Sequence, residues 1–304
     1  MVRLAQLTPA AKVPVAHVPS RKQRKFWRSP GIKLVGPAVI VTIVVFLLPV
    51  LYIVWQSFSD PQIGLDNYIW LFTNDSNLKV LGRTVSVGLT ATIITAVLAY
   101  PYAYVMSSST PLVKGLLMIL VLMPFWTSMM VRTFAWVIIL QQNGVLNSVL
   151  EPLGVAPVSI LGTTTATIIG MCQVLMPFMV LPLAAVMQSI DRRLPLAAQV
   201  MGASPTKSFL TVYLPLSLPG VVGGALMVFI LSLGFYITPA LLGSPRDQLL
   251  PNAIYTQVLE LLNWGQGGAL AVSLLLLVGL MLGLTGLVAR IFGVKIGRLG
   301  GTGL

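Results

Sequence analysis

Long apolar runs separated by short polar segments dominate the pattern along the chain. Runs with no charged residue, or with one, cover residues 35–55, 85–106, 116–140, 165–187, 221–242 and 267–289. Each run has 21–25 residues, and a helix of roughly 20 apolar residues crosses the ~30 Å hydrocarbon core of a bilayer. The pattern predicts an all-α membrane protein with six transmembrane helices and both termini on the same side.

Basic residues indicate which side that is, because cytoplasmic loops carry an excess of Lys and Arg. Fifteen of the 19 lie in the tail before residue 35, in the 107–115 and 188–220 loops and in the C-terminal tail. Three lie in the opposite loops, and Arg132 lies within the third run. This bias predicts cytoplasmic termini. We interpret the basic segment RKQRKFWRSP (21–30) as a contact with anionic lipid headgroups rather than with nucleic acid.

The composition excludes several kinds of metal site, catalytic site and transporter. The single cysteine, Cys172, excludes an internal disulfide framework and a metal site built from several cysteines. The single histidine, His17, lies in the N-terminal tail, so a membrane-embedded zinc site or Ser-His-Asp triad is excluded. No Asp or Glu occurs in the six runs. This absence argues against the alternative of another class, an ion-coupled secondary transporter or a channel, and against an intramembrane enzyme.

The 188–220 loop contains an unusual polar segment, LAAQVMGASPTKSFLTVYLPLSLPG (196–220). Its residues predict a helix over 191–201 that Gly202 ends in a left-handed conformation. Ser204 then fits an N-cap, with Pro205 at the first position of a second helix. Pro215 predicts that this second helix ends near Leu214. The pattern by itself leaves two interpretations open, a segment that lies on the headgroups and a docking element for a cytoplasmic protein.

The same segment resembles the EAA loop of ABC-importer permeases, whose pattern is E-A-A, three residues, G, nine residues, I, any residue, L-P. Here Leu196-Ala197-Ala198, Gly202 and Val212-Tyr213-Leu214-Pro215 follow that spacing, with Leu196 in place of the Glu. Three further segments look like the spermidine/putrescine importer branch of the family. They are MPFWTSMMVRTFAWVIILQQNGVLN (123–147), PFMVLPL (177–183) and LGFYITPALLGSPRD (233–247). The resemblance covers residues from about 85 to 290.

The resemblance implies the fold of a type I importer transmembrane domain in the bacterial inner membrane. Its core would be residues 85–290, after a basic cytoplasmic tail (1–32) and a first helix with a periplasmic loop (33–84), and before a cytoplasmic tail (291–304). A coupling loop at 191–215 would sit in a groove of a separate ATP-binding subunit, and the complex would contain two such subunits. A second permease, a related but different chain, and a periplasmic substrate-binding protein would complete the complex. The coupling residues implied are Leu196, Ala197, Ala198, Gly202, Ala203, Ser204, Pro205, Lys207, Phe209 and Pro215.

The chain itself has no G-x-x-x-x-G-K-[ST] phosphate loop. We therefore expect it to be a transport subunit that binds no cofactor or metal, while the partner ATPase binds ATP and Mg. The resemblance favours a polyamine or a related organic amine as the solute. Amino acids and opine-like compounds remain open alternatives.

Several side chains in the apolar runs are candidates for the solute path. They are Trp126, Arg132, Trp136, Gln173, Phe235 and Tyr236. Aromatic faces attract organic cations, although aromatic residues near a membrane interface more often form an interfacial belt. Arg132 lies 18 residues beyond Lys114, about 27 Å along a straight helix. It would then lie near the outer headgroups, where a contact with phosphate is at least as plausible as one with solute.

The charge bias predicts that the 188–220 loop is reached only from the cytoplasm. A Ser204→Cys variant in a Cys172→Ser background should resist a membrane-impermeant maleimide in intact cells and react after lysis. Labelling of intact cells would contradict the predicted orientation. A Ser148→Cys variant, in the loop between the third and fourth runs, is the control and should react before lysis.

Overall fold

A computed structural model describes the backbone of residues 30–291 and the side chains of residues 36–284. It divides into two units, residues 1–51 and 52–304, which are described separately. Described residues of the first unit form the amino-terminal part of one apolar helix, α1 (Pro30–Ser59). The predicted cytoplasmic tails, 1–32 and 291–304, lie almost wholly outside the described residues.

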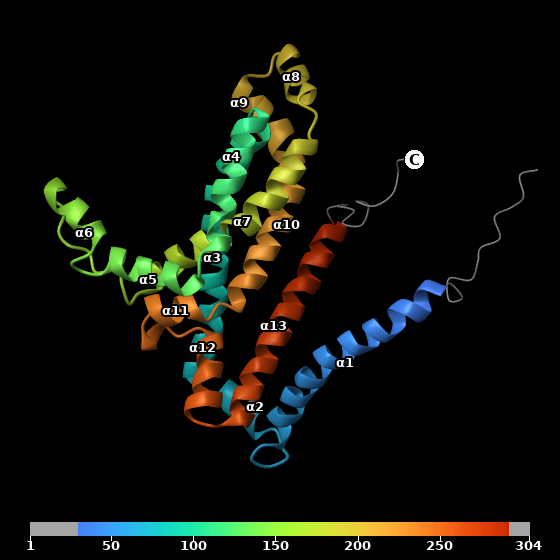
Figure 1. Ribbon diagram of the computed structural model, residues 1–304, viewed down its shortest axis with the longest axis vertical. Helices are drawn as coiled ribbons and strands as arrows, with labels where there is room; N and C mark the ends of the chain where they lie inside the picture. The colour runs from blue at the N-terminus through green and yellow to red at the C-terminus, as the bar shows by residue number, and fades with distance from the viewer. Residues whose placement is uncertain (1–29, 292–304) are drawn as a thin grey trace, which may run out of the picture. The chain divides into compact units, whose positions relative to one another are not determined.

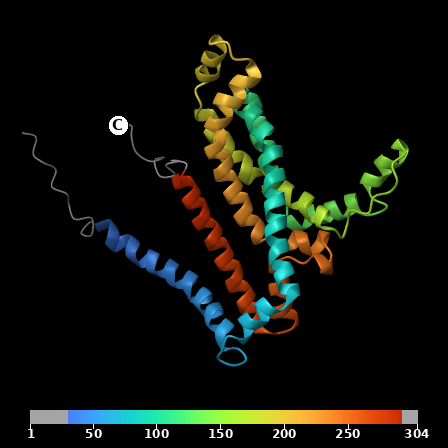
Figure 2. The ribbon, with the colours of Figure 1, turned by 180° about the vertical axis from the view of Figure 1, so that it is seen from behind.

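The described part of the second unit is made of helices and turns (Figures 1 and 2). After the end of α1 its α-helices are α2 (Asp66–Thr73), α3 (Asp75–Ser108), α4 (Pro111–Leu122), α5 (Met129–Leu140), α6 (Val145–Leu150), α7 (Thr164–Ser189), α8 (Arg193–Val200), α9 (Pro205–Ser208), α10 (Leu214–Leu233), α11 (Ile237–Leu242), α12 (Leu250–Tyr255) and α13 (Trp264–Ile291). Short 3₁₀ turns are η2 (Met123–Trp126), η3 (Glu151–Leu153) and η5 (Pro245–Asp247), and π-helical turns are η4 (Phe209–Tyr213) and η6 (Thr256–Glu260). The prediction of an all-α fold is confirmed for the described residues.

Within residues 36–284, whose side chains the structure describes, five helical segments are long and apolar enough to cross a membrane. They are Gly36–Ser59, Asp75–Ser108, Thr164–Ser189, Pro205–Leu233 and Trp264–Leu284. A sixth span exists only if the bent pair Pro111–Trp126 and Met129–Leu153 is counted as one. The two parts of this pair meet at 97°.

The third apolar run, 116–140, is therefore not the single straight helix that its composition predicts. Pro124 lies in the 3₁₀ turn η2, and Thr127 (φ −106°, ψ 142°) and Ser128 (φ −57°, ψ 136°) are extended. Proline removes a backbone donor, and extended residues cannot continue a helix. The ~27 Å estimate for the depth of Arg132 assumed a straight helix and does not hold.

Helices α3, α7 and α10 pack together and form the main core. Small side chains cover the buried face of α3, where Ala91, Ala99 and Ala103 have no exposed surface. On α10, Gly220 and Gly224 face α7: a Cβ at Gly220 would lie 2.9 Å from Val186 Cβ, and one at Gly224 would lie 2.7 Å from Met179 Sδ. Since lipid tails are as apolar as Leu, membrane helices associate mainly through such close packing.

Polar contacts join the outer segments of the second unit to this core. Asn67 Nδ2 donates to the carbonyl oxygens of Ser57 (3.0 Å) and Asp60 (2.7 Å). The Asp60 carboxylate accepts from Gly265 N at the start of α13 (2.9 Å). Thr84 Oγ1 on α3 accepts from Leu250 N at the start of α12 (2.8 Å). The last bond holds the start of α12 against the core helix α3, and the others tie α2 and the start of α13 to the end of α1.

The close approach of α10 to α7 predicts a strong contrast between two glycines on one helix. A Gly220→Val change should destabilise the folded protein by about 1–3 kcal/mol, because the added side chain overlaps Val186 and the Leu183 backbone. Thermal unfolding in detergent measures the effect. Gly223→Val is the matched control, since a Cβ there meets nothing within 4 Å. Equal unfolding midpoints for the two variants would contradict this packing.

Candidate functional site

The first half of the 191–215 loop forms as predicted. Helix α8 ends at Val200, and Gly202 takes φ +92°. Its N–H donates to Gln199 O (2.9 Å), and the Ala203 N–H donates to Ala198 O (3.0 Å). These two bonds are those of a Schellman motif, which requires a left-handed residue just beyond the helix. The prediction that Gly202 ends the helix is confirmed.

The second half of the loop begins as predicted and ends differently. Ser204 Oγ accepts from Lys207 N (3.3 Å), and Pro205 occupies the first turn of α9. The expected end near Leu214 is wrong, because the chain continues through η4 into α10 as one segment, Pro205–Leu233. The Leu214 N–H donates to Phe209 O, five residues back. A π-helical turn widens the helix at this point, and Pro215 is accepted in the first turn of α10.

Aromatic and polar contacts hold the loop against the end of α3. Phe209 and Tyr213 are stacked with ring centroids 5.6 Å apart, and Tyr104 meets both edge-on at 5.8 and 5.3 Å. Arg192 donates to Ser107 O (2.7 Å). Within the loop, Ser208 is fully buried and its hydroxyl donates to Pro195 O (2.6 Å), which joins α9 to α8.

The outer face of the loop is apolar at its tip. Leu196, Val200 and Met201 are 57%, 89% and 82% exposed. The predicted coupling residues Ala197, Gly202, Ser204, Pro205, Lys207 and Pro215 are also exposed, whereas Ala198, Ala203 and Phe209 are half-buried. Sequence reasoning did not include Val200 and Met201. The signal it missed is a pair of large apolar residues immediately before a helix-ending glycine, in a polar loop.

Two of the predicted path residues lie together in the structure. Trp136 Nε1 on α5 donates to Gln173 Oε1 on α7 (2.8 Å), so the amide of Gln173 has a protein partner. Arg132, one turn earlier on α5, has a buried Nε with no hydrogen-bond partner among the described residues. Trp126 is 75% exposed and belongs to none of the ring pairs in the described part of the chain.

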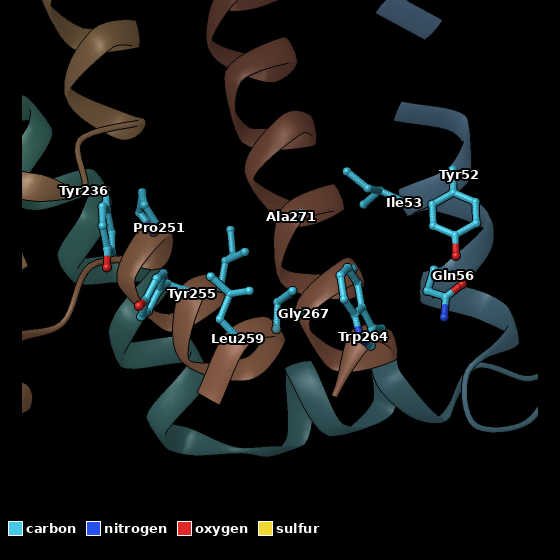
Figure 3. Close-up of a pocket in the computed structure, with 13 residues that line it drawn as sticks. Tyr52, Ile53, Gln56, Tyr236, Pro251, Tyr255, Leu259, Trp264, Gly267 and Ala271 are labelled. Carbon is cyan, nitrogen blue, oxygen red and sulfur yellow. The ribbon is translucent and has the colours of Figure 1, made fainter. Parts of the chain in front are cut away.

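Phe235 and Tyr236 occupy the non-helical link between α10 and α11. Phe235 packs against the main core, and the Tyr236 ring lies 5.0 Å from the Tyr255 ring at 33°. These two tyrosines line both of two adjoining cavities. The larger, of about 410 Å³, is almost wholly apolar and extends past Trp264 to Tyr52 (Figure 3). The smaller, of about 180 Å³, has polar walls.

Comparison with known proteins shows the family to which the chain belongs. Residues 88–294 match the family described as binding-protein-dependent transport system inner membrane component. The chain belongs to this family. It is therefore a transport component of the inner membrane rather than an enzyme. The predicted domain boundaries at 85 and 290 remain predictions, although the matched region is close to them.

Two relatives and one solved structure illustrate the similarity. The chain is 36% identical over 222 residues to the spermidine/putrescine transport system permease protein PotB of Haemophilus influenzae, over 72% of this chain and 77% of that protein. It is 35% identical over 259 residues to PotB of Salmonella typhimurium, over 80% and 90%. A bacterial alginate ABC transporter chain, solved with a periplasmic protein bound to an alginate pentasaccharide, superposes with a TM-score of 0.70 at 18% identity, over 88% of this chain and 98% of that chain. At this identity the superposition supports the fold alone.

The conformation of Gly202 generates a prediction for the 191–215 loop. A Gly202→Val variant should lose stimulated ATP hydrolysis and transport, because a β-branched residue at φ +92° is strained by roughly 1 kcal/mol or more. A Cβ there would meet nothing within 4 Å of the chain itself, so the spans should still insert. The measurement is ATPase association and turnover of the purified complex in lipid.

Two further variants test whether the effect of Gly202→Val comes from backbone strain within the 191–215 loop. Gly154→Val is the matched control, because Gly154 also has positive φ (+74°) and open space but lies outside the loop. Gly202→Asn should retain more activity than Gly202→Val, since Asn tolerates the left-handed conformation. Normal association and turnover in Gly202→Val would show that the loop is not the coupling element.

Proposed function

We propose that the chain is the membrane-spanning subunit of an ATP-driven importer of polyamines such as spermidine and putrescine. The observation that carries this proposal is the 35–36% identity to spermidine/putrescine permeases over most of both chains. A transport complex of this family also needs an ATPase, a binding protein and a second permease. We infer two ATP-binding subunits, which bind ATP and Mg, and a related second permease.

The 191–215 loop is proposed as the contact with the ATPase. Its tip offers Leu196, Val200 and Met201 to a partner, and exposed Lys207 and Arg193 flank this tip. Large exposed apolar residues at the end of a polar loop are typical of an interaction surface. Because Leu196 replaces the family's Glu, apolar contact would replace whatever polar contact that Glu makes.

Motion at the loop would reach the spans through the backbone. Pro205–Leu233 forms one continuous helical segment, so a displacement of the Ser204–Pro205 corner moves α10 directly. The Arg192–Ser107 bond and the Tyr104 contacts would pass the same displacement to α3. Since packed helices move as rigid bodies between discrete arrangements, the loop can couple ATP-driven closure to opening of the path.

The orientation proposed for this function places the 191–215 loop and both termini in the cytoplasm. The charge bias of fifteen basic residues against three supports it. The α11–α12 region lies at the opposite end of α10 from the loop (Figure 1), so it would face the periplasm. A substrate-binding protein would deliver its solute there.

Transport by the reconstituted complex tests the proposal. Proteoliposomes that hold the permease pair, the ATPase and internal ATP should take up labelled spermidine or putrescine only when the binding protein is present. Excess unlabelled amino acids should not compete. Uptake without ATP, or uptake of a solute without an amine in place of polyamines, would contradict the proposed function.

A further inference from the structure

The smaller cavity beside the Tyr236–Tyr255 pair has an acceptor-rich lining. It is lined by residues of α11, the 243–248 loop, α12 and η6. Glu260 is the one charged side chain among its lining residues. No cation of the described chain lies within ion-pair distance of this carboxylate. Glu260 is exposed, so this unpaired carboxylate at the cavity is open to solvent and to a cation that enters from solvent.

A second carboxylate in this region, that of Asp247, already has partners within the chain. Asp247 lies 3.7 Å from Arg83 Nε and accepts from Ser244 Oγ (3.1 Å). Its charge is already paired, and it does not line the cavity. The Ser244 hydroxyl, which does line it, has its hydrogen engaged by Asp247 and can only accept a further bond. Ser244 therefore adds another acceptor to the cavity wall.

A buried acceptor without a partner belongs to a residue of the same wall. Asn252 lines the cavity, and its Oδ1 is buried with no hydrogen-bond partner in the described chain. This oxygen has almost no accessible surface, so a group in the cavity does not reach it, and Asn252 forms the wall through its other atoms. An ammonium group has three donors and no acceptor, which matches the acceptors that Glu260 and Ser244 add to this wall.

The Tyr236–Tyr255 pair offers an apolar surface to the hydrocarbon part of an amine ligand. Tyr236 and Tyr255 line the polar cavity and the apolar cavity of about 410 Å³. Aromatic faces bind both alkyl chains and cations. A cation in the polar cavity would thus have apolar surface directly beside it.

We propose that the polar cavity is a subsite for one primary ammonium group of the transported solute, with Glu260 as its counter-ion and the Ser244 hydroxyl as an acceptor. The adjoining methylene chain would lie on the Tyr236–Tyr255 pair. At about 180 Å³ the cavity is smaller than the roughly 300–1,000 Å³ of typical ligand pockets, so it takes one end of a polyamine. This inference rests on the proposed function only in that the solute is an amine.

Transport kinetics test the subsite. In reconstituted complexes, Glu260→Gln should raise the KM for spermidine about tenfold or more, because a hydrogen-bonded charge partner is lost. The maximal rate should change little. Glu151→Gln is the matched control, since Glu151 is an exposed carboxylate outside the cavity. Equal KM values for the two variants would overturn the subsite.

A chemical probe gives a second readout that does not depend on transport. Thr256→Cys places a thiol in the lining, in a Cys172→Ser background. Within the assembled complex it should react several-fold faster with the cationic 2-aminoethyl methanethiosulfonate than with the anionic 2-sulfonatoethyl reagent. Adding Glu260→Gln should remove this preference, and spermidine should slow the reaction of the parent.

The outcomes separate the two proposals. If the wild-type complex imports no polyamine, the proposed function fails, and the reagent preference still decides whether the cavity selects cations. If spermidine is imported while the preference is absent or survives Glu260→Gln, the subsite fails and the proposed function stands. Ser148→Cys on α6 serves as the reference thiol, for which no effect of Glu260→Gln is expected.

Discussion

Close packing of backbones, with small residues between them, is the constraint on which the rest of this structure depends. Helices in lipid gain nothing from hiding apolar side chains, because the tails outside are equally apolar. The buried face of α3 accordingly carries Gly88, Thr92, Thr95, Ala99 and Ala103 at spacings of three and four. A Cβ at Gly88 would lie 2.7 Å from Ser232 Oγ of α10. This contact surface fixes α7 and α10 against α3, and the loop and cavities at their ends follow from it.

At one end, the core presents the 191–215 loop as a rigid element. Its first helix is closed by Gly202, and its second helix continues into α10 without a break. The π-helical turn η4 makes this continuity compatible with Pro215. The same turn lies at the Phe209–Tyr213 pair, which stacks and meets Tyr104. The residues that allow the helix to continue are therefore also those that fasten it to α3.

At the other end, the helices are interrupted rather than continuous. Thr127 and Ser128 separate α4 from α5, and Gly234–Tyr236 separate α10 from α11. Non-helical backbone at membrane depth is tolerated where protein buries it or where it lines a cavity. Tyr236 lines two cavities, and the Trp136–Gln173 bond joins α5 to α7 nearby in the fold. Irregular backbone at this end is consistent with a solute path.

The sequence by itself determined the class of the protein and the local form of its loop. Apolar runs long enough to span a bilayer predicted the helices, and Gly202, Ser204 and Pro205 predicted the corner, because caps depend on neighbouring residues alone. Tertiary structure decided the rest. The helix continues past Pro215 because of a π-helical turn that the Tyr104 contacts support. The bend after Pro124 depends on the packing of α5 against α7 and α11. Glu260 and Tyr236 lie 24 positions apart in the sequence and line the same cavity, a juxtaposition that only the tertiary structure creates.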